Sequence, residues 1–356
     1  MRITRIFIQI LFGILLLFGW NITCSEQTTN PQGQEEGPVV WPDAETINNR
    51  IGRAINLGNA LEAPFEGAWG VTLEEDYFDL IDSAGFEAVR IPVRYSAHAE
   101  LDSPYTIDAE FLRRVDWAVQ NALGRDLIAI INIHHYEEIM QHPTEQKSRF
   151  LGLWRQLSRH YQDYSSSLVF EVLNEPNDQL TPDLWNQYLV QALAIIRQTN
   201  PQRAVIIGTA NWGGIGALSN LEIPEVDSMI IVTYHYYNPF RFTHQGADWV
   251  DGSDAWLGTT WSETEAEKQA VRNEFDVVET WAGEHNRPIF MGEFGVYSTA
   301  DLGSRVRWTN FVAREAEHRG FSWAYWEFCS GFGIYDADTQ TWNRYLLQAL
   351  VPPESN

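Results

Sequence analysis

The chain has 356 residues, is 44% hydrophobic and carries a formal net charge of −24. So acidic a chain is a poor partner for nucleic acid, whose phosphates are bound by Lys and Arg. The length allows one large domain or two ordinary ones, and two cysteines, Cys24 and Cys329, are too few for a disulfide framework.

The N-terminal segment has the layout of a secretory signal. Arg2 and Arg5 precede an apolar run, Ile6–Trp20, and a short polar end closes at Cys24. The run is too short for a comfortable membrane span. The stretch before Cys24 also resembles a bacterial lipoprotein cleavage site, where the mature chain starts on a lipidated Cys. Release and lipid anchoring through Cys24 both stay open, so we expect a bacterial protein that is secreted or held at the cell surface.

Residues 25–40 are rich in Gln, Glu, Thr, Asn and Gly. A segment with so few apolar side chains cannot offset the entropy lost on folding, which predicts a flexible polar linker. The remaining residues, 41–352, are expected to form one catalytic domain, since no further linker divides them.

From Trp41 onward the chain repeats an apolar strand, a polar loop and an amphipathic helix. The strands are predicted at Ala54–Gly58, Ala88–Val93, Leu127–His134, Leu168–Leu173, Ala204–Thr209, Met229–His235, Ile289–Gly292 and Ser322–Trp326. Helices are predicted near 76–84, 109–122, 148–161, 182–198, 263–282, 304–318 and 344–350, with only a weak helix after the fifth strand.

Eight such units with continuously apolar strands predict a single (β/α)8 TIM barrel, an α/β fold whose strands are buried on both faces. A doubly wound open sheet is the alternative. It is disfavoured because no Gly-rich phosphate-binding motif follows the first strand.

The active site of such a barrel lies at the C-terminal ends of the strands. The polar or aromatic residues predicted there are Arg90, His134, His135, Asn174, Glu175, His235, Tyr237, Glu293 and Trp326. Glu175 and Glu293 follow the fourth and seventh strands, so they can approach the barrel axis from different sides. Two facing carboxyl groups are what glycoside hydrolysis requires: one protonates the departing oxygen, and the other attacks or stabilises the anomeric carbon.

Adjacent histidines, His134 and His135, raise the alternative of a metal site. On an extended strand their side chains point to opposite faces, so they would share an ion only where the strand bends. We therefore expect neither a metal nor an organic cofactor, and expect hydrogen-bonding roles for the histidines.

Several motifs together resemble glycoside hydrolase family 5, the cellulase family of the clan whose acid and nucleophile follow strands four and seven. They are RIPVR at Arg90–Arg94, NIHH at Asn132–His135, LNEP at Leu173–Pro176, HYYNP at His235–Pro239 and GEFG at Gly292–Gly295. NLGNALEAP, FTHQGADWV and YWEFCSGFGIYD look closest to a subfamily of endoglucanases that includes thermophilic bacterial enzymes, some also acting on mannan.

The resemblance implies Glu175 as acid/base and Glu293 as nucleophile. It implies that Arg90 and Tyr237 contact Glu293, that His235 sits beside Glu175, and that Trp326 forms the floor under the sugar. The residues it implies as further sugar contacts are Asn59, Glu62, His134, His135, Asn174, His244 and Trp249.

We therefore expect a monomeric, retaining endo-β-1,4-glucanase whose partner is a β-glucan polymer. One alternative is an endo-β-1,4-mannanase or a dual glucanase/mannanase, since only the axial 2-hydroxyl of mannose separates the two at the cleavage point. A second alternative is a glycan-binding protein whose barrel has lost catalytic activity. It is disfavoured because both carboxylates are present.

Overall fold

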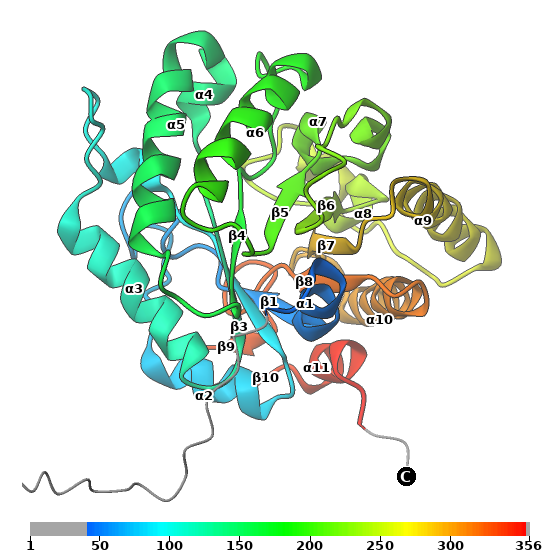
Figure 1. Ribbon diagram of the computed structural model, residues 1–356. Helices are drawn as coiled ribbons and strands as arrows, with labels where there is room; N and C mark the ends of the chain where they lie inside the picture. Colours follow the sequence, from blue (N-terminus) through cyan, green and yellow to red (C-terminus); the bar gives the residue numbers. More distant parts are fainter. Residues whose placement is uncertain (1–40, 354–356) are drawn as a thin grey trace, which may run out of the picture. The chain divides into compact units, whose positions relative to one another are not determined.

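The computed structural model describes residues 41–353, and their centre is a closed barrel of eight parallel strands (Figure 1). The predicted signal segment and linker, residues 1–40, lie outside the described residues. The barrel strands are β1 (Arg53–Asn56), β2 (Ala88–Ile91), β3 (Ile128–Asn132), β4 (Leu168–Glu171), β5 (Val205–Gly208), β6 (Ile230–Tyr236), β7 (Ile289–Phe294) and β8 (Ser322–Tyr325).

Each strand pairs with its neighbours in sequence, and β1 closes the ring against β8, with Ala54 opposite Ala324. The described residues form eleven α-helices, most of which cover the outside of the ring (Figure 1). They are α1 (Ala44–Ile51), α2 (Glu75–Ser83), α3 (Ala109–Leu123), α4 (Glu137–Gln141), α5 (Pro143–His160), α6 (Pro182–Arg197), α7 (Ala210–Gly213), α8 (Phe240–Thr243), α9 (Glu265–His285), α10 (Leu302–His318) and α11 (Arg344–Leu350). Three 3₁₀ turns, 95–98, 215–220 and 253–256, and a small hairpin of β9 (Tyr335–Asp336) and β10 (Thr341–Trp342) complete the described chain. The predicted (β/α)8 barrel is confirmed.

The apolar core has two layers. One fills the inside of the barrel, where side chains such as Ala88, Ile130 and Phe290 meet Ile47 and Ile51 of α1. The larger layer lies between the strands and the surrounding helices. Because the interior is packed and α1 closes the end at which the strands begin, a substrate has to enter at the opposite end, where the strands finish.

The structure corrects several predicted boundaries. Helix α5 begins at Pro143, five residues before its predicted start, because a proline fits the first turn of a helix. Strand β7 continues to Phe294, so Glu293 lies on the strand itself and not after it. Helix α1 and the β9–β10 hairpin were not predicted, since α1 is short and strongly polar and each hairpin strand has only two residues.

Within residues 41–353, no helix combines the length and the apolar character needed to cross a lipid bilayer.

Candidate active site

Two glutamates face each other at the C-terminal end of the barrel. Glu175 stands four residues after the end of β4, in a left-handed conformation with φ of 44°, and Glu293 is the fifth residue of β7. One carboxylate oxygen of Glu175 and one of Glu293 lie within 4.8 Å of each other. Retaining glycosidases hold their two carboxyl groups about 5–5.5 Å apart, whereas inverting ones leave about 6.5–9.5 Å for a water molecule. The spacing fits direct attack by a carboxylate.

Arg90 of β2 is the electrostatic centre of the site. Its side chain is fully buried, and Nη1 donates to Oε1 of Glu293 at 2.7 Å while Nη2 donates to Oδ1 of Asn174 at 2.8 Å. The Tyr237 hydroxyl donates to the other oxygen of Glu293 at 3.0 Å. Burial and the negative charges of Glu293 and Glu175 raise the pKa of Tyr237 well above its ordinary value, so the phenol keeps the proton that it donates. Both oxygens of Glu293 therefore accept hydrogen bonds.

His235 of β6 lies beside both carboxylates, with Nδ1 2.7 Å from Oε1 of Glu175 and 3.6 Å from Oε2 of Glu293. Burial by itself would lower the pKa of His235, but the charges of Glu293 and Glu175 outweigh it and raise this pKa. Among the described residues, Glu175, His235 and Glu293 form the one group of side chains spaced to hold a metal ion. The Arg90 charge on Glu293 and the readiness of His235 to keep its proton both oppose a cation there.

The two neighbouring histidines lie on the same side of the site. The two histidines were expected on extended backbone, but they are not there. Strand β3 ends at Asn132, two residues before its predicted end, and His135 adopts a φ of 45°. The rings of His134 and His135 meet edge to face at 4.6 Å, and His134 stacks nearly parallel to Trp326 at 5.8 Å. Burial, with the nearby charges of His135 and Arg90, lowers the pKa of His134 well below its ordinary value, which keeps its ring neutral.

The loop after β1 corrects one expected sugar contact. Asn59 is partly exposed and donates from Nδ2 to the Ser330 hydroxyl at 2.7 Å, which ties this loop to the loop after β8. Glu62 was expected on the surface of the cleft but is fully buried, because its oxygens accept the backbone N–H groups of Asn59 and Ala60. Its carboxylate organises the loop and has no exposed surface toward the cleft.

A second buried carboxylate, Glu327, organises the loop after β8 in the same way. It accepts backbone N–H groups from Cys329, Ser330 and Phe332. Burial raises the pKa of Glu327 to about 7, helped by the charge of Glu62, and burial likewise raises the pKa of Glu62 to about 7. The two carboxyl groups therefore influence each other's protonation across the two loops.

This pair predicts a component of stability that is lost as pH rises. An unfolded Glu has a pKa of about 4.3, so between roughly pH 4.3 and 7 the folded state binds more protons than the unfolded state, and the free energy of unfolding falls by up to about 3 kcal/mol per group. The loss levels off about one pH unit above 7, where both groups are ionised in the folded state as well. Glu327→Gln should remove its share of that slope, measured by denaturant unfolding at pH 5, 6 and 7.

A constant offset between Glu327→Gln and the wild type is expected as well, because the amide NH₂ faces backbone N–H groups. Only the change of that offset with pH tests the prediction. Glu284→Gln, on the exposed side of α9, is the control and should leave the slope unchanged. An equal pH dependence in Glu327→Gln and the wild type would contradict the assignment.

Aromatic rings extend the site along the loop after β6. His244 is buried and stacks on Phe240 at 4.1 Å, and burial lowers its pKa to about 4. Trp249 is 57% exposed and meets the ring of Tyr297 edge to face at 5.0 Å. Trp212, in the turn after β5, is 60% exposed, and its backbone N–H donates to the carbonyl of Pro176, the residue after Glu175, at 3.3 Å. Exposed indole faces of this kind suit the apolar faces of pyranose rings.

Three residues in contact with this centre were not identified from the sequence. They are Glu171, the last residue of β4, and the amides Asn56 and Asn132, the last residues of β1 and β3. Glu171 pairs with Arg90 through two hydrogen bonds, and Asn56 accepts another from Arg90. The available signal was a carboxylate or amide closing an otherwise apolar strand, a position where an unpaired polar group would be costly.

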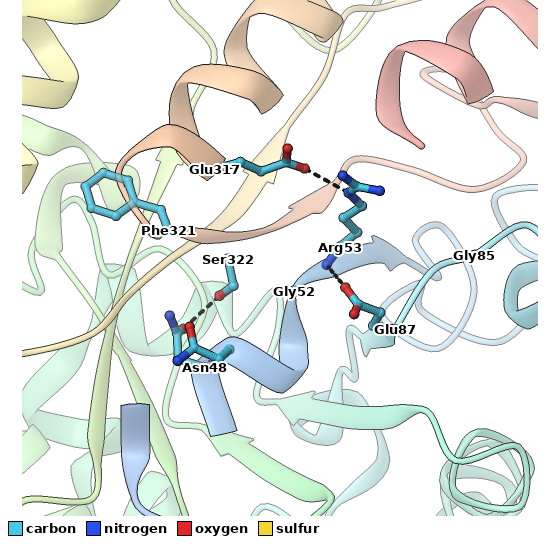
Figure 2. Close-up of a pocket in the computed structure, with 10 residues that line it drawn as sticks. Asn48, Gly52, Arg53, Gly85, Glu87, Glu317, Phe321 and Ser322 are labelled. Carbon is cyan, nitrogen blue, oxygen red and sulfur yellow. Dashed lines mark hydrogen bonds and ion pairs between the residues drawn. The ribbon is translucent and has the colours of Figure 1, made fainter. Parts of the chain in front are cut away.

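A polar pocket of about 450 Å³ lies at the other end of the barrel (Figure 2). Its residues include Arg53 and Ser322, the first residues of β1 and β8, and Glu87, which precedes β2. Arg53 pairs with Glu317 at 2.8 Å, and its backbone N–H donates to Glu87 at 2.9 Å. The pocket lies where the strands begin, so it is separate from the site around Glu175 and Glu293. The charged side chain of Arg53 in it already has a partner.

Comparison with known proteins identifies the family. Residues 53–331 match the family model described as cellulase (glycosyl hydrolase family 5). Endoglucanase H of Acetivibrio thermocellus is 38% identical over 310 residues, which cover 85% of this chain but only 33% of that protein, so the chain spans about a third of this relative's length.

Two crystal structures of Thermotoga maritima Cel5A are similar in fold and sequence. One is a complex with mannotriose and the other a complex with cellobiose, and each is 52% identical, with a TM-score of 0.85, over 86% of this chain and 100% of that one. The family match covers every barrel strand and both facing glutamates. The chain belongs to the cellulase family, glycosyl hydrolase family 5.

Proposed function

We propose that the protein is a retaining endo-β-1,4-glucanase. The observation that carries the proposal is the pair of carboxylate oxygens, one from Glu175 and one from Glu293, within 4.8 Å of each other at the strand ends. The endoglucanase name of the A. thermocellus relative and the cellobiose complex of T. maritima Cel5A support a β-1,4-glucan as substrate.

The reaction proceeds by two displacements. Glu293 attacks the anomeric carbon while Glu175 gives its proton to the departing glycosidic oxygen, and a covalent glycosyl ester forms on Glu293. Glu175 then removes a proton from water, the water oxygen attacks the same carbon, and the bond to Glu293 breaks. Two inversions at one carbon retain its configuration.

The neighbours divide the remaining work. Arg90 and Tyr237 donate to Glu293, which keeps it ionised and aimed at the anomeric carbon. His235 contacts Glu175 and holds it in place for proton transfer. Asn174, fixed by Arg90, orients the 2-hydroxyl of the sugar being cleaved.

Further side chains form the walls of the sugar site in this proposal. Trp326 lies under the ring at the cleavage point, next to His134, and His135 contacts sugar hydroxyls. Asn59 lines one neighbouring subsite, while His244 and Trp249 line another. None of these roles needs a metal or an organic cofactor, since acid, nucleophile and orienting groups all come from side chains.

A dual glucanase/mannanase is the second candidate, favoured by the mannotriose complex of T. maritima Cel5A. The experiment is a comparison of initial rates on carboxymethyl cellulose, glucomannan and galactomannan. We expect fast release of reducing ends from carboxymethyl cellulose with a rapid fall in viscosity, because an endo-acting enzyme cuts inside long chains. Fast mannan cleavage with near-zero glucan activity would overturn the glucanase assignment.

We also propose that the protein is exported by its N-terminal signal and acts outside the cell as a monomer. The charged start and apolar run of residues 1–24 support export, and Cys24 supports a lipid anchor as the alternative to release. The intact mass of the exported protein separates the two, because an anchored chain would start at Cys24 and carry the mass of the lipid.

A further inference from the structure

Glu171 is a buried carboxylate next to the catalytic pair that the two displacements do not use. It ends β4 and is 1% exposed, among Val169, Phe170 and other apolar residues of the strand. Its Oε2 accepts from Nε of Arg90 at 2.6 Å and its Oε1 accepts from Nη2 at 2.7 Å. Asn132 adds a third donor to Oε1 at 3.2 Å. A fully buried charge of this kind is retained only with close partners, and here the main partner is Arg90.

Every N–H group of Arg90 is used. A guanidinium has five donors in a rigid plane. Two point at Glu171, and the other three reach Asn56 at 2.8 Å, Glu293 at 2.7 Å and Asn174 at 2.8 Å. A two-point contact on one edge of a rigid plane fixes its position and rotation, so it also fixes where the other donors point.

We propose that Glu171 is a positioning residue of the reaction: it clamps Arg90 in the orientation that delivers one N–H to Glu293 and another to Asn174. This inference rests on the proposed glycosidase function. Glu171 touches neither substrate nor reacting atoms, and its effect passes entirely through Arg90. Small errors in the direction of preorganised donors are costly to catalysis, and removing one such donor typically costs about 10²–10³-fold in rate.

Glu171 also sets the charge of the buried centre. Burial would raise the pKa of Glu171, but the guanidinium of Arg90 outweighs burial and lowers it, so the group is ionised. With Glu293 ionised as well, two negative charges share one guanidinium. Ionisable groups from several elements face the buried centre around Arg90 and Glu171. They are Arg90 of β2, His134 of the loop after β3, Glu175 of the loop after β4, His235 of β6, Tyr237 directly after β6, and Glu293 of β7.

Two substitutions separate position from charge. Glu171→Gln removes the charge and turns an NH₂ toward Arg90, so we expect kcat to fall about 100-fold with little change in KM. We also expect both limbs of the pH–activity profile to move to lower pH by about one unit, because a less negative centre releases protons more readily. Glu171→Asp keeps the charge but shortens the side chain, so kcat should fall while both limbs stay in place. Rates on an aryl β-cellobioside from pH 4 to 9 measure both effects.

The matched control is Asp227→Asn. Asp227 forms a comparable two-point contact with Arg197, at 2.7 and 3.0 Å, just before the start of β6 and away from the site. We expect this variant to melt at a lower temperature than the wild type. Its kcat should stay within about twofold of the wild type, and the limbs of its pH–activity profile should stay within about 0.2 pH units. A merely structural Glu171 would give the same result as Asp227.

The outcomes are distinguishable. If the wild type cleaves no β-glycoside, the proposed function fails. If the wild type is active and Glu171→Gln keeps its kcat per folded molecule and its pH limbs, the inference about Glu171 fails alone. Circular dichroism and a thermal melt give the folded fraction. Should Glu171→Gln not fold, Glu171→Asp decides, since an unchanged kcat in that variant overturns the clamp.

Discussion

Replacing Glu293 by alanine is expected to lower kcat on soluble glucans by at least about 10⁴-fold, because the covalent route loses its nucleophile. Binding should persist, since the sugar site keeps its aromatic walls and Asn174. The space vacated by the carboxylate lies within 4.8 Å of Glu175 and next to Arg90, so a small anion can enter it. Added azide should restore cleavage of an activated aryl cellobioside. Azide attacks the anomeric carbon, aryl oxide leaves, and the product is the glycosyl azide of inverted configuration.

The configuration of the glycosyl azide distinguishes the two catalytic roles. Inverted configuration identifies Glu293 as the nucleophile, because azide rescue of an acid/base variant gives retained configuration instead. Proton NMR of the glycosyl azide reads it directly. Titration with a cello-oligosaccharide checks that binding survives. Glu284→Ala, on the exposed side of α9, serves as the control and should keep wild-type turnover. If Glu293→Ala itself kept wild-type turnover, the nucleophile would have to be another group.

The fold was largely predictable because burial on both strand faces leaves a plain pattern. Runs such as Ile128–Ile131 and Val205–Ile207 are continuously apolar, and they appear in the structure as β3 and β5 with every residue buried. The predicted strand ends were less accurate. Strand β3 ends at Asn132 although the apolar and aromatic pattern continues to His134. The His134 N–H still donates to the Val93 carbonyl at 2.8 Å, so the chain stays beside its neighbour past the end of the regular strand.

Position at a strand end was a good guide to which residues meet, and a poor guide to which of them face the cleft. Glu175, Glu293, Arg90, His235 and Tyr237 come together as the barrel requires. Glu62 also follows a strand, but its side chain turns inward to accept the N–H groups of its own loop. The direction of a side chain in a loop depends on local turn geometry, which the sequence does not display.

The buried neighbours of Arg90 show a second limit. Asn56, Asn132 and Glu171 are the last residues of strands whose pattern is mostly apolar, where a single polar residue looks like an exception. Their purpose becomes visible only when the donors of Arg90 are matched one by one to acceptors from three other strands and the loop after β4. A pattern along one strand carries no information about such pairing across the barrel.

Glu175→Ala should produce a loss that depends on the leaving group, which distinguishes it from Glu293→Ala. A sugar alcohol leaves poorly without a proton, so cleavage of glucan chains is expected to fall by about 10³-fold, within the 10²–10⁴ range of general acid catalysis. A dinitrophenolate leaves without help, so the first displacement on dinitrophenyl cellobioside should change little. The second displacement still needs a base, and the glycosyl ester on Glu293 should accumulate, with kcat and KM falling together.

The accumulated ester provides the measurement. Mass spectrometry of the Glu175→Ala enzyme, quenched during turnover of dinitrophenyl cellobioside, should show the added mass of a cellobiosyl group on the peptide containing Glu293. Azide should speed its release and give the glycosyl azide of retained configuration, since two inversions then occur at the anomeric carbon. An equal loss on both substrates, with no accumulated ester, would mean that Glu175 does not protonate the leaving oxygen. Because His235 is held 2.7 Å from Glu175, it would then be the next group to test as the acid.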